Sequence, residues 1–272
     1  FVYLFLFYTT QLSCFLLLTI FNLKAQEFNF SQITLRDGLP SSQINCIYQD
    51  DEGYIWIGTN EGVKKYVGKS FIDIYARNPV SLSRPIKSIA ESDKHVWFAN
   101  DRSLFKCVGN YTEEYPLFTK TNPVLINKIV PASDSLVYVL TTLGVWEFKD
   151  KKFTQLFTNL KVDVENITCG YYRKNENELW LGTDGSGIYV LNTLTNQLEN
   201  KHQALYDTLK NEKIKDIESY FDSKFFISVL GKGIIQYNFS TPVWLDGSAA
   251  NWLAYTTDIH ADKKGNIWFS TF

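Results

Sequence analysis

Residues 54–59 read Tyr-Ile-Trp-Ile-Gly-Thr, and runs of this kind, with an aromatic residue among aliphatic ones, occur six times along the chain. The central aromatic residues are Trp56, Trp97, Tyr138, Trp180, Phe226 and Trp268. Successive members are separated by 41, 41, 42, 46 and 42 residues. A nearly constant spacing of this length indicates an internal structural repeat.

Each run has the same kind of flanking sequence. An aliphatic residue, usually behind a glycine, follows the aromatic residue by seven or eight positions, as in Gly62-Val63. A shorter apolar stretch, such as 44–47, begins eleven to thirteen residues before the aromatic residue. Turns rich in Asp and Gly, as in 50–53, lie between this stretch and the run that contains the aromatic residue. Each unit therefore reads as four short strands joined by tight turns.

Four strands in about 42 residues match the size of one β-propeller blade. A single small sheet cannot bury both of its faces, so such sheets are expected to stack side by side, with the six aromatic residues as wedges between them. The strand-rich composition excludes an α-solenoid, and a β-sandwich would not keep a 42-residue period. We predict an all-β propeller of five full four-stranded blades and part of a sixth.

Composition excludes several classes of protein. The chain has 272 residues with 27 Lys and Arg against 29 Asp and Glu, so the formal charge is −2, and no basic blocks occur. This segment therefore lacks the positive surface that nucleic-acid binding requires. A hydrophobic content of 45%, with 16% aromatic residues, rules out a disordered chain.

The N-terminal segment is expected to direct export. Residues 1–23 carry no charge, Lys24 is the first charged residue, and the small residue Ala25 offers a cleavage site. We predict a signal peptide over residues 1–25, with an uncleaved membrane anchor as the alternative, and a propeller domain over residues 26–272. The chain begins at Phe1 and stops at Phe272 within an expected strand, so we expect both ends to have been cut from a longer protein.

The first repeat resembles a known family. Residues 37–40, Asp-Gly-Leu-Pro, together with 44–63 are similar to the two-component regulator propeller repeat. The sixth unit matches through 262–271, whereas the fourth has Lys174 where the repeat has Asp, and the third and fifth replace Trp. The resemblance covers about residues 27–272. It implies a ring of about seven blades, so that the ring in this chain would be incomplete.

The resemblance also implies a function. In this family, such propellers form the periplasmic sensing part of sensor histidine kinases, including hybrid two-component systems. The chain would then be an exported, non-catalytic ligand sensor whose full-length parent is a homodimeric, membrane-anchored kinase, held in the membrane by regions outside the propeller. A small molecule or a glycan is the expected ligand. The alternatives are a secreted propeller enzyme of glycosidase, lyase or dehydrogenase type, and an interaction scaffold without signalling.

Candidate ligand contacts lie in the turns between the second and third strands of the units, because loops on a rigid scaffold commonly carry function. These candidates are Asn60, Glu61, Asp101, Arg102 and Asp184.

Motifs for catalysis, metals or cofactors are not visible in the sequence. The three histidines are scattered, residues 182–187 read as a glycine-rich turn rather than a phosphate loop, and no nucleophile motif appears. We therefore expect no catalytic residues, no metal and no cofactor in this chain. Three cysteines, Cys46, Cys107 and Cys169, remain once the expected signal peptide with Cys14 is set aside. They lack zinc-ligand spacing and are an odd number, so we expect them to be small buried apolar side chains.

Overall fold

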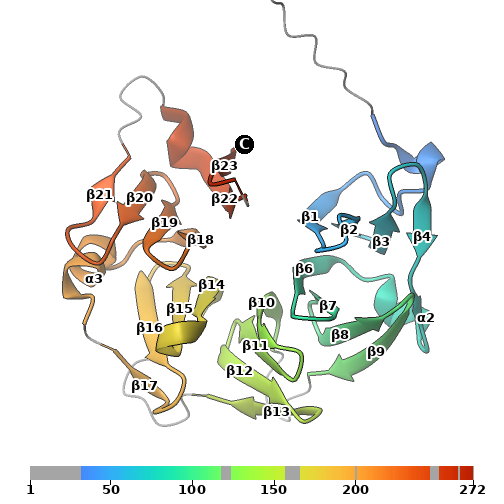
Figure 1. The fold of residues 1–272 in the computed structure, drawn as a ribbon, viewed down its shortest axis with the longest axis horizontal. Coiled ribbons are helices and arrows are strands. Elements are labelled where there is room, and N and C mark those ends of the chain that lie inside the picture. Colours follow the sequence, from blue (N-terminus) through green and yellow to red (C-terminus); the bar gives the residue numbers. More distant parts are fainter. Residues whose placement is uncertain are drawn as a thin grey trace, which may run out of the picture. The chain divides into compact units, whose positions relative to one another are not determined.

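The computed structural model describes residues 32–117, 124–156, 166–199, 201–245, 251–262 and 264–271. The expected signal peptide or anchor, residues 1–25, lies outside these ranges. From Thr34 onward the chain forms one compact unit, and it consists almost entirely of β-strands (Figure 1). None of the helices in the described ranges is both long and apolar enough to cross a membrane.

The strands form successive antiparallel sheets, which are the blades. Blade 1 contains β1 (Ile44–Gln49), β2 (Ile55–Thr59), β3 (Gly62–Tyr66) and β4 (Phe71–Asp73). Blade 2 contains β6 (Ile86–Glu91), β7 (Val96–Asn100), β8 (Ser103–Val108) and β9 (Tyr111–Pro116). Blade 3 contains β10 (Ile126–Ser133), β11 (Leu136–Thr141), β12 (Gly144–Lys149) and β13 (Lys152–Gln155).

The later blades follow the same order. Blade 4 contains β14 (Ile167–Arg173), β15 (Glu178–Thr183), β16 (Ile188–Asn192) and β17 (Gln197–Leu198). Blade 5 contains β18 (Ile214–Tyr220), β19 (Lys224–Val229), β20 (Gly233–Tyr237) and β21 (Val243–Trp244). Blade 6 contains β22 (Thr256–Ala261) and β23 (Ile267–Thr271). The short helices are η1 (Leu35–Asp37), α2 (Pro79–Leu82), η2 (Lys174–Glu176), α3 (Gln203–Leu209) and η3 (Asn251–Tyr255).

The first strand of every blade is its inner strand. The inner strands β1, β6, β10, β14, β18 and β22 pack against one another in sequence order, and the other strands of each blade lie progressively farther out (Figure 1). This arrangement is a β-propeller, and it confirms the predicted fold of five four-stranded blades and a partial sixth.

In blade 1 the outer strand is followed almost at once by a strand that belongs to the sheet of blade 2. The outer strand β4 ends at Asp73, and the next strand is β5 (Tyr75–Ala76), which pairs in parallel with β9 of blade 2. Between the two strands Ile74 is buried in the apolar cluster shared by blades 1 and 2. The chain thus passes from blade 1 to the sheet of blade 2 at Ile74, whose side chain is buried between the two blades.

The repeated aromatic residues lie at the seams between blades. Trp56 packs with Ile86 and Phe98 of blade 2, and Trp180 stacks on Phe225 of blade 5 at a centroid distance of 4.2 Å. Trp97, Tyr138 and Phe226 also lie in apolar clusters that contain residues of the following blade. These five side chains are at most 7% exposed, whereas Trp268 in blade 6 is 62% exposed.

Glycines sit where the second and third strands of a blade join. Gly187 adopts a φ of 78°, which L-residues rarely adopt, and a Cβ at this position would lie 2.4 Å from the carbonyl oxygen of Leu209. Gly185 in the same segment also has a positive φ. The structure confirms that residues 182–187 form a hairpin turn.

Candidate functional site

Every inner strand carries a β-bulge at the same point. In each blade the register with the second strand shifts just after the first residue of the inner strand, as between Ile44 and Cys46 or between Ile126 and Lys128. The residue left over at each bulge is polar in all six blades: Asn45, Lys87, Asn127, Thr168, Lys215 and Thr257. A bulge redirects the side chain of its extra residue. The six blades thus present six polar residues at equivalent positions.

These six residues line one pocket, which we call the inner-strand pocket. It has a volume of about 720 Å³ and is bordered by β1, β6, β10, β14, β18 and β22. Tyr48, Tyr171 and Tyr172 add aromatic surface to its wall. A concave site that combines aromatic surface with converging polar groups is typical of small-ligand binding.

A charged cluster crosses this pocket one residue beyond the bulges. Lys128 Nζ of blade 3 lies 2.5 Å from Asp216 Oδ1 of blade 5, and the other oxygen of Asp216 accepts a hydrogen bond of 2.9 Å from the backbone N–H of Ile259 in blade 6. Asp216 is buried, while Asp258, at the equivalent position of blade 6, is exposed. One carboxylate thereby connects three blades.

The proton affinities of the cluster follow from this geometry. Burial opposes the charge on Lys128, but the nearby Asp216 carboxylate outweighs this effect and raises the pKa of the lysine well above its usual range. Burial, followed by repulsion from Asp216, raises the pKa of Glu218 to about 8. Although Asp258 as a whole residue is exposed, loss of water around its carboxylate in the pocket, followed by repulsion from Asp216, raises the pKa of Asp258 as well. Lys128 thus stays charged at neutral pH, while Glu218 holds a proton for most of the time.

Two of the bulged residues also connect neighbouring blades. Asn127 Nδ2 donates to the carbonyl oxygen of Ile167, and Thr168 Oγ1 donates to that of Ile214, over 2.8 and 2.6 Å. Ile167 and Ile214 occupy equivalent positions, so the same hydrogen bond recurs at two successive seams. Within the described ranges, the amines of Lys87 and Lys215 form no ion pair.

The turn residues named from the sequence lie elsewhere. Asn60 and Glu61 join β2 to β3, Asp101 and Arg102 join β7 to β8, and Asp184 follows β15. None of the five belongs to the described lining of the inner-strand pocket. Their role as ligand contacts stays a prediction.

The turn residues have polar partners that help to hold the turns. Arg84 donates to both oxygens of Asp101 over 2.8 and 2.6 Å, and these hydrogen bonds lower the pKa of Asp101. Lys213 pairs with Asp184 at 3.2 Å, and Asn60 accepts a hydrogen bond of 2.9 Å from Asn45.

The bulges left a signal in the sequence. Segments such as 44–47, 86–89 and 126–129 have the form Ile-polar-X-Ile, with apolar residues three positions apart. In a regular strand residues three apart point to opposite faces, so a spacing of three that repeats in register indicates an extra residue. The spacing within these short stretches therefore locates the six bulged polar residues in the sequence.

The three cysteines of the described part are free thiols. Cys107 and Cys169 are buried, as expected, while Cys46 is partly buried and lines the inner-strand pocket. Burial raises the pKa of Cys46 and Cys169 to about 12 and that of Cys107 to about 11. The thiols are therefore protonated at neutral pH and weakly nucleophilic.

Comparison with known proteins agrees with a β-propeller that contains a two component regulator propeller repeat. The pattern of the two component regulator propeller matches residues 38–61, which span β1 and β2 of the first blade. The chain therefore carries this repeat within a β-propeller, in agreement with the resemblance seen in the sequence. A stretch of 60 residues is 43% identical to the histidine kinase P4 of Formosa agariphila, and it spans 21% of this chain and 4% of that kinase.

Solved structures share the fold. The extracellular domain of a putative hybrid two-component system from B. thetaiotaomicron is 18% identical with a TM-score of 0.56, over 86% of this chain and 37% of that one. PorZ of Porphyromonas gingivalis, a component of the type-IX secretion system, is 15% identical with a TM-score of 0.60, over 84% of this chain and 37% of that one. A catalytically inactive virginiamycin B lyase from Staphylococcus aureus is 16% identical with a TM-score of 0.60, over 92% of this chain and 83% of that one. At these identities the likeness establishes the fold alone.

Proposed function

We propose that this chain is part of the exported sensing region of a two-component receptor, and that it binds a small polar ligand in the inner-strand pocket. The observation that carries the proposal is the ring of six bulged polar residues at equivalent positions around one pocket. The repeat matched in blade 1 and the extracellular two-component domain of the same fold support the receptor assignment.

The pocket suits a ligand with hydrogen-bonding groups of both kinds. Lys87 and Lys215 supply donors, Glu218 and Asp258 supply acceptors, and Tyr171 offers a flat apolar face. A saccharide and a short peptide both match this description. A ligand that contacts several inner strands at once would change how the blades pack, and a receptor dimer would pass that change across the membrane to its kinase.

The ligand test uses thermal shift and calorimetry on purified residues 26–272 with monosaccharides, oligosaccharides and dipeptides. We expect at least one compound to raise the melting temperature, and the Lys87→Ala/Lys215→Ala double variant to reduce this rise. Lys64→Ala/Lys149→Ala is the matched control, because these two lysines lie on outer parts of their blades and do not line the pocket. Stabilisation that persists in the Lys87/Lys215 variant would place the ligand elsewhere, and turnover of a compound would favour the enzyme alternative.

The location is tested by fusing alkaline phosphatase behind residue 271 in a bacterial host, because this enzyme is active only outside the cytoplasm. Activity that depends on residues 1–25 is the expected result. A second fusion carries, at the same position, a reporter enzyme that is active only in the cytoplasm. If this second fusion is active and the alkaline phosphatase fusion is inactive, export is contradicted.

A further inference from the structure

One seam of the propeller differs from the others. Trp180 and Phe226 are 46 residues apart, whereas the other repeats measure 41 or 42. Helix α3 (Gln203–Leu209) lies in this longer connection, between β17 and β18. Leu205 and Leu209 of α3 are completely buried in the cluster that joins blades 4 and 5. The helix is therefore anchored in the seam rather than held loosely on the surface.

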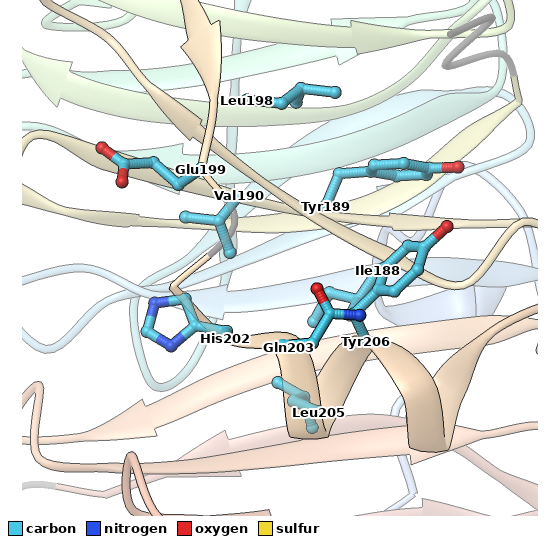
Figure 2. A pocket seen from close by; sticks show the side chains of 9 residues that line it. All are labelled: Ile188, Tyr189, Val190, Leu198, Glu199, His202, Gln203, Leu205 and Tyr206. Carbon is cyan, nitrogen blue, oxygen red and sulfur yellow. The ribbon is translucent and has the colours of Figure 1, made fainter.

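A pocket of about 210 Å³ opens between α3 and strands β16 and β17 (Figure 2). We call it the α3 pocket. Ile188, Val190 and Leu205 supply aliphatic surface, and Figure 2 shows Tyr189 and Tyr206 together on one side of the pocket, away from His202 and Glu199. The α3 pocket shares no lining residue with the inner-strand pocket.

The two tyrosines form an aromatic corner. Their ring centroids lie 6.2 Å apart with an angle of 61° between the ring planes. Aromatic rings prefer edge-to-face or offset contacts at about 4.5–7 Å between centroids. A third ring placed in this corner can therefore contact one tyrosine with its face and the other with its edge.

Several polar groups of the α3 pocket are already engaged by the protein. Glu199 Oε1 accepts a hydrogen bond of 2.8 Å from Asn192, Gln203 Nε2 donates to Asp207 over 2.8 Å, and His202 Nδ1 lies 3.2 Å from the hydroxyl of Tyr237. With these groups engaged, a ligand with many hydroxyl groups would leave part of them without partners, which is costly. The side-chain oxygens of Glu199 and Gln203 still offer acceptor capacity for a donor.

We propose that the α3 pocket binds a small uncharged aromatic compound with one hydrogen-bond donor, for which indole and phenol are the simplest probes. An apolar protein cavity of about 150 Å³ takes up benzene, so 210 Å³ accommodates one aromatic ring system with its substituent. The ring lies against Tyr189, Tyr206 and the aliphatic surface. This inference stands independently of the proposed function, because it concerns a different pocket and a different ligand chemistry.

The test titrates purified residues 26–272 with indole, phenol and glucose, and uses ligand-observed NMR and calorimetry. We expect saturable indole binding with a Kd of about 0.1–1 mM, as is reasonable for so small a ligand. Tyr206→Ala is expected to raise this Kd by about tenfold or more. The matched control is Tyr111→Ala, which removes a tyrosine that is 70% exposed on β9 and should leave the Kd unchanged.

A second variant guards against unfolding of α3 in Tyr206→Ala. Leu198→Trp keeps an apolar side chain on β17 and narrows the pocket, so it too should weaken indole binding while the melting temperature stays within a few degrees of the wild type. Indole binding that is equal in the wild type and both variants would overturn the proposal. Saturation by glucose but not indole, or no saturation by either aromatic probe up to about 10 mM, would overturn it as well.

Discussion

At the scale of single residues, the partner of the seam indole changes from blade to blade. In blade 1 the Nε1–H of Trp56 donates to Asp50 over 2.8 Å, and in blade 6 that of Trp268 donates to Asp262 over 3.0 Å. Lys174 occupies the corresponding position of blade 4, so Trp180 donates instead to Glu178, over 3.1 Å. A residue that breaks the repeat is thus compensated by a buried acid two positions before the indole.

Glu178 keeps its charge although it is fully buried. Burial would raise the pKa of Glu178, but His202, Lys201 and Trp180 outweigh this effect and lower it to about 2. Lys201 Nζ lies 2.5 Å from Glu178 Oε1, and Arg173 lies 3.5 Å from Oε2. A carboxylate whose pKa is lower in the folded than in the unfolded state stabilises the fold above the unfolded value and loses this contribution as the pH falls toward the folded value.

The pH dependence of unfolding tests this residue. Between pH 5 and pH 2.5 the wild type should lose roughly 2–3 kcal/mol more unfolding free energy than Glu178→Gln, which keeps an acceptor for Trp180 but has no charge to lose. Urea denaturation at several pH values measures the difference. Glu61→Gln, which alters an exposed turn carboxylate, should follow the wild type. Parallel profiles for the wild type and Glu178→Gln would show that the acid is not held ionised.

At the scale of elements, each blade is completed by the next one. The aromatic residue on the second strand is covered by the inner and second strands of the following blade, as Trp97 is by Ile126 and Val137. Trp97 is 1% exposed, whereas Trp268 occupies the same place in its repeat and is 62% exposed. The burial of an aromatic residue here depends on a neighbour about 40 residues along the chain.

These two tryptophans form a matched pair for mutation. Trp97→Ala should lower the unfolding free energy by about 3–5 kcal/mol, because it empties a filled seam. Trp268→Ala removes the same side chain where little of it is buried and should cost less than about 1 kcal/mol. Chemical denaturation of both variants measures the difference. Similar losses would argue that Trp97 does not act as a wedge between blades.

At the scale of the whole molecule, the first and last described blades each present an apolar face. Ile47 on β1 is 65% exposed, although the equivalent Ile89 and Ile129 of the next two blades are buried. Trp268 is exposed on β23. Exposed strand faces of this kind promote association.

Residues 26–272 expressed alone should therefore bind a hydrophobic dye and self-associate with rising concentration. The Ile47→Lys/Trp268→Lys double variant should reduce both effects, because it places charge on both faces. Leu194→Lys is the control, since this leucine is 76% exposed in a turn of blade 4. Dye fluorescence and light scattering measure the outcome. A monodisperse wild type without dye binding would show that neither face is adhesive.

The sequence alone determined the architecture, because blade number, strand order and the seam positions of the aromatic residues follow from local patterns that recur along the chain. Apolar alternation and turn glycines belong to short stretches, and the same kind of stretch recurs every 41–46 residues. Physical interactions within one strand or one turn produce these patterns, so they can be read without knowing what lies next to them in space.

Only the tertiary structure decided which residues share a site. Lys128 and Asp216 are 88 residues apart in the sequence and meet because blades 3 and 5 direct their inner strands into the same pocket. The α3 pocket likewise depends on how one helix seats in a single seam. The turn residues chosen from the sequence were accessible and polar, but the described pocket is lined by inner strands, since six bulges point their polar residues into it.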